Sequence, residues 1–356
     1  MNRPAPPHRR RLGELYGLRV LSRLGVDRIV RIIAATMLLG AWALTIVQIR
    51  PDLSRPTDLL SDTSNYLAAG ERVRDGHFLY RLTAGDRPAP ADNPPYWSTP
   101  LLSPPLVAVI WAPLASMPGG FAEYAWWTAG MAGTTLFGLL AIARGKTWVA
   151  IGVALLSYLL GVTAWSGNLN AFLVPLIGLI WPLTRENHPR ARGDYLAGAL
   201  VALMSGLKLT PVFLGVWFVA TGNRRALVAA AITGIILLGF SVALAGTQAY
   251  ADYLQIGGAT ATVGGGGLSL VGLLAGAGVS GRIAALSPAL VAVVAGALAL
   301  AVRSRPGLAF FVTTLAVIFA SPVVRFESLA LVVSAFSPWL RWSSRTMPNE
   351  HPGHPG

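Results

Sequence analysis

The chain has 356 residues, of which 54% are hydrophobic and only 12% are charged, and its mean hydropathy is +0.57. Soluble domains carry about 25% charged residues, so this composition excludes a cytosolic globular enzyme and a disordered chain. It predicts a polytopic membrane protein whose apolar helices are about 20 residues long. The chain has no cysteine, which excludes disulfides, thiol catalysis and zinc–thiolate sites.

The net charge of +13 comes from basic residues that flank apolar runs rather than from one continuous patch. Such flanking charges are typical of membrane topology signals, so nucleic acid is not an expected partner. Residues 1–28 are rich in arginine and have no cleavage-site pattern, so we interpret them as a cytoplasmic tail rather than a signal peptide.

Ten apolar segments are expected to cross the membrane as helices. In chain order they are Ile29–Ile49, Phe121–Ala143, Thr147–Thr163, Leu169–Leu183, Asp194–Leu207, Pro211–Thr221, Ala226–Ala245, Ile283–Val302, Gly307–Ala320 and Ser328–Leu340. Together they predict one all-α membrane domain over residues 29–340, followed by a cytoplasmic tail over 341–356. A further apolar stretch, Pro100–Met117, is interrupted by prolines. It either spans the bilayer or forms a juxtamembrane or re-entrant helix within 100–118.

The distribution of lysine and arginine decides between these alternatives. If Pro100–Met117 does not span, nineteen basic residues lie on the cytoplasmic side and nine outside; if it spans, eleven lie inside and seventeen outside. Positive charge accumulates on the cytoplasmic side, so the non-spanning topology is favoured and both termini are cytoplasmic. The unusual polar segments, including a first loop over 50–99 with seven of the fifteen acidic residues, then lie on the extracytoplasmic side.

One short helix is predicted inside this loop, over Ser61–Gly76. Ser61 or Asp62 supplies an N-cap, and Gly76 is a favourable residue just after the C-terminus. Tyr66, Ala69 and Val73 recur at helical spacing, so the helix is expected to lie on the membrane surface with this apolar stripe facing the lipid.

Asp62 is the first candidate for chemistry. Its carboxylate could take the proton of an acceptor hydroxyl as a general base, or it could simply cap the helix. Asp58 and Asp52 are further candidates for the base, because spacing alone does not separate the three carboxylates.

Lys208 lies between two apolar runs that are both short for a bilayer crossing. Asp194–Leu207 would extend about 21 Å, against a hydrocarbon core of about 30 Å. The turn at Lys208 is therefore expected to lie in a recess below the outer surface, where an ammonium group requires an anionic partner such as a lipid phosphate. The alternative is one continuous 26-residue helix.

Two further pairs of polar residues are expected on the outer side. Asn168 and Asn170 could bind sugar hydroxyls or phosphate oxygens, or could cap a helix. Arg325 could hold a phosphate with Glu327 as its partner, or the two could form a local ion pair. The five histidines are scattered and show no metal-ligand spacing.

Several segments, in this order, resemble motifs of the polyprenyl-phosphate-sugar-dependent membrane glycosyltransferases of family 87. They are DTSNYLAAGERVRDGHFLY (62–80), PPLVAVIWAPLASMP (104–118), SGNLN (166–170), GLKLTPVFL (206–214), GGLSLVGLL (266–274) and SPVV (321–324). The resemblance covers roughly residues 29–340. It departs from the family pattern after Ser321–Pro322, where Arg325, Glu327 and Ser328 replace the usual Ser-Trp and paired histidines.

The resemblance implies a GT-C fold and an inverting transfer of mannose or arabinofuranose from a polyprenyl-phosphate sugar to a cell-envelope glycolipid or polysaccharide at the outer leaflet. It implies that Asp62 is the catalytic base and that Lys208 and Arg325 bind the donor phosphate. Tyr66, Tyr80, Asn168, Asn170 and Glu327 would contact substrate. No cofactor is expected, and a role for a divalent cation is left open. The alternatives are a flippase or transporter of lipid-linked sugars and an inactive scaffold homologue.

Overall fold

The computed structural model describes residues 8–49, 61–80, 101–118, 120–185, 190–262, 269–284, 286–321, 324 and 326–342. These residues form α-helices, short 3₁₀ helices and connections, and no strand is present among them. The prediction of an all-α protein is therefore confirmed for the part of the chain that the structure describes.

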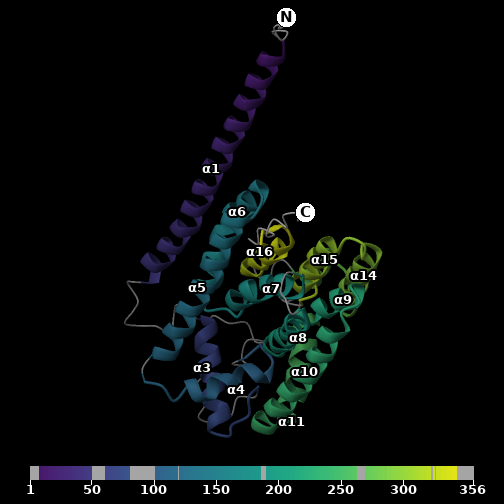
Figure 1. Ribbon diagram of the computed structural model, residues 1–356. Helices are drawn as coiled ribbons and strands as arrows, with labels where there is room; N and C mark the ends of the chain where they lie inside the picture. Colours follow the sequence, from purple (N-terminus) through teal and green to yellow (C-terminus); the bar gives the residue numbers. More distant parts are fainter. Residues whose placement is uncertain are drawn as a thin grey trace, which may run out of the picture.

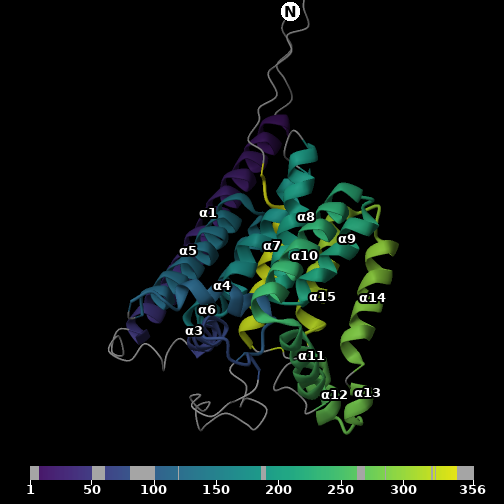
Figure 2. The same ribbon diagram turned by 90° about the horizontal axis from the view of Figure 1, so that it is seen from below.

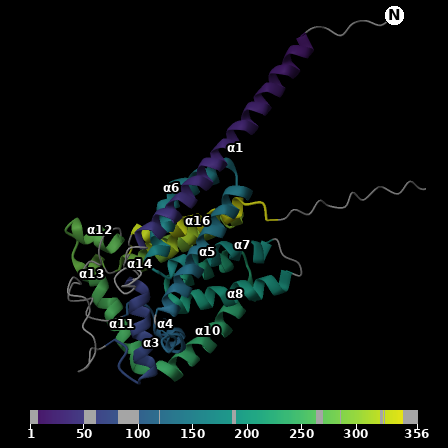
Figure 3. The same cartoon turned by 90° about the vertical axis from the view of Figure 1, so that its left-hand side faces the viewer.

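Five helical segments are long and apolar enough to cross a membrane. They are Gly25–Val47 within α1 (His8–Ile49), α5 (Phe121–Arg144), α6 (Thr147–Trp165), α10 (Arg224–Ala245) and Arg282–Ala301, which includes most of α13 (Gly281–Ala284) and all of α14 (Ser287–Ala301). α1 begins at His8, so it starts within the predicted tail over 1–28 rather than at Ile29. Its N-terminal part extends beyond the other helices (Figures 1 and 3).

The remaining apolar helices are shorter than a full crossing. They include α4 (Pro105–Leu114), α7 (Asn170–Arg185) and α15 (Pro306–Phe319), as well as the segments Thr210–Ala220 and Ser328–Trp339. Helices of 10–17 residues extend only about 15–26 Å, which is less than the hydrocarbon core of about 30 Å. The total of ten crossings therefore stays a prediction.

The helices form a bundle around one main hydrophobic core. α1, α5 and α6 pack together on one side, and α7 and α8 (Arg190–Leu207) lie in the middle (Figures 1 and 2). α8 packs extensively against α10, while α9 (Leu214–Ala220), α14 and α15 complete the opposite side. α3 (Ser61–Arg74), α4 and α11 (Thr247–Thr262) gather at one end of the bundle.

α3 occupies almost the predicted span, but part of what was expected of it is wrong. Asp62 lies within the first turn and is therefore not the N-cap, whereas the side chain of Ser61, the other candidate, lies outside the described residues. Tyr66 and Ala69 do not face lipid, because α4 covers them and both side chains are buried. The predicted glycine at the C-terminus is confirmed: Gly76 has φ 72°, and the His77 N–H donates to the Arg72 carbonyl at 2.8 Å.

A glycine allows the close packing of α3 on α4. A Cβ atom at Gly70 would lie 2.6 Å from the backbone carbonyl carbon and oxygen of Trp111. Backbone atoms cannot move aside as a flexible side chain can, so Gly70→Ala would force the two helices apart.

We therefore expect Gly70→Ala to destabilise the protein by about 1–3 kcal/mol. The comparison variant is Gly239→Ala in α10, where a Cβ atom meets nothing within 4 Å and alanine favours the helix. Thermal unfolding of the two purified variants in one detergent measures the difference. Equal melting temperatures would contradict the close contact of α3 with α4.

Candidate functional site

The turn between α6 and α7 holds the start of α3. Gly167 in this turn has φ 67°, and a Cβ atom there would lie 2.4 Å from Cγ2 of Thr63. The Gly167 carbonyl accepts a hydrogen bond from Nε1 of Trp126 at 3.0 Å. The Ser166 carbonyl accepts one from the backbone N–H of Asp62 at 3.2 Å. The backbone of Asp62 is thus fixed against a turn about one hundred residues later in the chain.

Asp62 and Asn168 are joined directly through their side chains. Nδ2 of Asn168 donates to Oδ2 of Asp62 at 2.7 Å. Oδ1 of Asn168 accepts from the backbone N–H of Asn170 at 2.8 Å, which is an Asx turn at the start of α7. Because both ends of the amide are used, its NH₂ group is held in the direction of the carboxylate.

Asn170 extends these contacts to a lysine and a serine. Its side chain is fully buried, Oδ1 accepts from Nζ of Lys208 at 2.8 Å, and Nδ2 donates to Oγ of Ser328 at 3.4 Å. We call Asp62, Asn168, Asn170, Lys208 and Ser328 the polar network. It brings together residues from α3, the α6–α7 turn, the end of α8 and the 3₁₀ helix η4 (Phe326–Leu331).

The helix break that was predicted at Lys208 is confirmed. α8 ends at Leu207, and the Lys208 N–H closes its last turn on the Met204 carbonyl at 2.8 Å. The chain then forms a 3₁₀ helix over Thr210–Phe213, with Pro211 near its start, before α9 begins. The alternative of one continuous 26-residue helix is therefore wrong. The depth of Lys208 in the membrane stays a prediction.

Tyr66 and Tyr80 lie in the hydrophobic cluster beside the network. The ring of Tyr66 is 5.9 Å from Trp111 and 6.2 Å from Trp126. The hydroxyl of Tyr80 donates to the Ser103 carbonyl at 2.6 Å, and its ring is 5.9 Å from that of Tyr253. Burial raises the pKa of Tyr80 well above its usual value and that of Tyr253 to about 12, so both hydroxyls stay protonated at neutral pH. Their contact with substrate stays a prediction.

Some predicted site residues lie outside the described residues, namely Asp52, Asp58 and Arg325. The backbone of Glu327 belongs to η4, but its side chain is outside the description. Sequence reasoning missed Ser328 as a site residue, although it lies in the segment that departs from the family pattern. Among the described residues, no group of three or more histidines, aspartates or glutamates could hold a metal ion.

Comparison with known proteins adds a family assignment. The model of glycosyltransferase family 87 matches residues 102–346. The chain belongs to glycosyltransferase family 87. The matched range includes Asn168, Asn170, Lys208 and Ser328 of the polar network, whereas Asp62 precedes it. Together with the five long apolar helices, membership of family 87 indicates a multi-pass membrane protein.

Two curated relatives carry the same name, polyprenol-phosphate-mannose-dependent alpha-(1-2)-phosphatidylinositol pentamannoside mannosyltransferase. The protein of Mycolicibacterium smegmatis is 25% identical over 47% of this chain, and that of Mycobacterium tuberculosis is 28% identical over 45%. The matches span 40% and 37% of the relatives' own lengths, which is well under two thirds of either. No solved structure matches this chain.

Proposed function

We propose that this chain is a membrane glycosyltransferase that moves a sugar from a polyprenyl-phosphate donor to a lipid-linked or polysaccharide acceptor at the outer leaflet. The observation that carries the proposal is a series of hydrogen bonds between Asp62 and Lys208. The side-chain amide of Asn168 bonds to the carboxylate of Asp62 and to the backbone N–H of Asn170, and the side chain of Asn170 accepts from the ammonium group of Lys208. A sugar phosphate donor requires both groups, a base for the acceptor hydroxyl and a cation for the departing phosphate.

In the proposed step the acceptor hydroxyl gives its proton to Asp62 as its oxygen attacks the anomeric carbon. The bond between that carbon and the phosphate oxygen breaks, and the electron pair leaves with the polyprenyl phosphate. Lys208 stabilises the extra negative charge on this phosphate, and attack from the opposite face inverts the anomeric centre. Asn168 and Asn170 keep both charged groups in position, so little reorganisation is needed during the reaction.

The length of the central helices supports a donor that stays in the membrane. α7 and α8 connect the polar network to the opposite end of the bundle, and Asn170–Arg185 extends only about 24 Å. This is less than the bilayer core, so the network would lie below the level of the outer headgroups. A polyprenyl phosphate could reach it without leaving the leaflet. The names of both relatives specify a mannose donor, which favours mannose over arabinofuranose for this chain.

The test is transfer by the purified full chain in liposomes. Radiolabelled polyprenyl-phosphate mannose and polyprenyl-phosphate arabinofuranose are the donors, and phosphatidylinositol pentamannoside is the first acceptor because both relatives' names contain it. Time-dependent, acceptor-dependent appearance of labelled glycolipid is the expected result.

A transporter and a scaffold give different results in the same vesicles. Movement of labelled donor between leaflets without product would favour the flippase alternative. If well-folded protein shows neither labelled product nor movement of donor, across the donors and a panel of envelope acceptors, the scaffold alternative would be favoured.

A further inference from the structure

A pocket lies at the opposite end of α7 and α8 from the polar network. Its cavity of about 360 Å³ is formed by the end of α7, the start of α8, the end of α9 and the turn into α10. Asp194, which lines it, is fourteen residues before Lys208, a separation of about 21 Å along a helix. The pocket is therefore separate from the proposed reaction centre, although α7 and α8 contribute to both.

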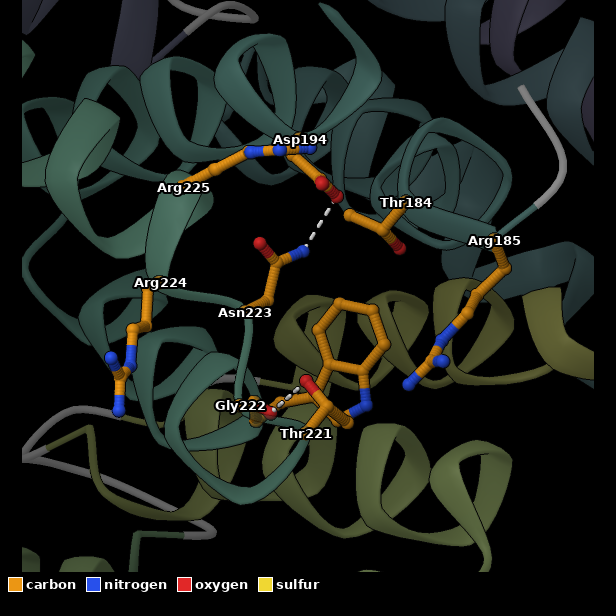
Figure 4. A pocket seen from close by; sticks show the side chains of 9 residues that line it. Thr184, Arg185, Asp194, Thr221, Gly222, Asn223, Arg224 and Arg225 are labelled. Carbon is orange, nitrogen blue, oxygen red and sulfur yellow. Dashed lines mark hydrogen bonds between the residues drawn. The ribbon is translucent and has the colours of Figure 1, made fainter. Parts of the chain in front are cut away.

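The lining is strongly basic. Arg185, Arg224 and Arg225 line the cavity, and Asp194 is the single acidic residue among the described residues that line it. Figure 4 shows Arg185 and Arg224 on opposite sides of the space, with Asn223 between them. Three guanidinium groups against one carboxylate leave an excess of positive charge, and guanidinium groups bind phosphate oxygens through paired N–H donors.

Two sets of contacts hold the pocket in shape. The Asp194 carboxylate, 6% exposed, accepts from Nδ2 of Asn223 at 2.6 Å, while Oδ1 of Asn223 caps α10 by accepting from the Ala226 N–H at 3.1 Å. The guanidinium carbon of Arg185 lies 5.8 Å from the ring centre of Trp217, whose Nε1 donates to the Pro306 carbonyl at 3.0 Å. These contacts position Asp194, Asn223 and Arg185 around the cavity.

The surroundings of the pocket indicate where its ligand would come from. Arg224 is the first residue of α10, which has 22 residues. Only about 6% of the residues in the most apolar part of this helix are buried inside the protein. Side chains along it, including Val228, Ile232 and Ile235, are more than half exposed. A lipid whose phosphate lies among the arginines could therefore lay its acyl chains against α10.

We propose that this arginine pocket binds the phosphate headgroup of an anionic phospholipid at the membrane face opposite the polar network. Basic pockets between membrane helices are suited to such headgroups. Arg185, Arg224 and Arg225 would then form a binding site, in addition to serving as topology signals.

The test uses the full chain in nanodiscs of phosphatidylcholine with increasing fractions of phosphatidylglycerol. Native mass spectrometry counts retained lipid, and thermal unfolding measures stabilisation. For the wild type we expect saturable retention of phosphatidylglycerol together with a rise in melting temperature. The half-saturating lipid fraction should rise about fivefold for each arginine removed in Arg185→Gln and Arg224→Gln.

The matched control is the double variant Arg303→Gln/Arg305→Gln, which removes two exposed arginines that do not line the pocket. It should bind phosphatidylglycerol as the wild type does. Arg224→Lys keeps the positive charge but lacks the paired N–H donors, so it should lose part of the preference for phosphatidylglycerol. A partial loss in this conservative variant separates lost binding from misfolding. Inorganic phosphate is added to pure phosphatidylcholine discs in a parallel arm.

Three outcomes would overturn the proposal. Equal loss of phosphatidylglycerol retention in the pocket variants and the control variant would mean that basic residues attract the lipid without a specific site. Unchanged retention in Arg185→Gln and Arg224→Gln would mean that the pocket holds no headgroup. Full stabilisation by inorganic phosphate, with no further effect of phosphatidylglycerol, would assign the pocket to a soluble phosphate instead.

Discussion

Asp62→Asn is expected to lower the rate of sugar transfer by about 10²- to 10⁴-fold, the usual contribution of a general base. An asparagine at this position keeps the size of the side chain, and its Oδ1 can still accept the 2.7 Å hydrogen bond from Asn168. It cannot take up the proton of an acceptor hydroxyl. The substitution therefore removes the chemistry while the polar network keeps its geometry.

Initial rates with saturating donor and acceptor measure the effect, alongside melting temperature and membrane yield. Asp75→Asn is the matched control, because Asp75 lies just after the same helix and is an exposed partner of Arg74 at 2.8 Å. It should retain near-wild-type rates. If Asp62→Asn turned over like Asp75→Asn, the base would have to be another carboxylate.

Lys208→Ala is expected to lower the transfer rate by about 10²- to 10³-fold, since one preorganised donor to a developing anion contributes this much. It also leaves the buried Oδ1 of Asn170 without its 2.8 Å donor, so we expect the protein to lose about 1–3 kcal/mol of stability. Lys208→Arg keeps a positive charge and should recover part of the rate.

The chain has only one other lysine, Lys146 in the turn between α5 and α6, and Lys146→Ala is the natural control. Donor titrations separate two roles of Lys208. If it acts on the donor phosphate, kcat or the KM for polyprenyl-phosphate sugar changes beyond what stability explains. A variant that is destabilised but has normal kinetics at low temperature would make the lysine structural.

The features predicted correctly from sequence are those with a local physical cause. Two short apolar runs, Asp194–Leu207 and Pro211–Thr221, predicted the break at Lys208. The helix of the first loop followed from apolar spacing, and Gly76 marked its end because only the left-handed conformation closes that turn. Each of these inferences needed only a stretch of neighbouring residues.

The features that were missed depend on contacts between distant parts of the chain. Spacing placed Tyr66 and Ala69 on one face of α3 but could not tell that α4 rather than lipid covers that face. Asn168 bonds to Asp62 across 106 residues, and Asn170 bonds to Ser328 across 158. The sequence suggested these asparagines as ligands or caps, but it contained no signal that the two residues together would link Asp62 to Lys208.

The unequal lengths of the central and peripheral helices have a consequence for the surrounding bilayer. α10 is long enough for a full crossing, whereas α7 has only 16 residues. Because α7 lies in the middle of the bundle, neighbouring helices rather than lipid surround it. The lipids would therefore adapt to the length of α10 and the other peripheral helices, and a bilayer too thick for them would compress at the edge of the protein at a cost of a fraction of a kcal/mol per ångström.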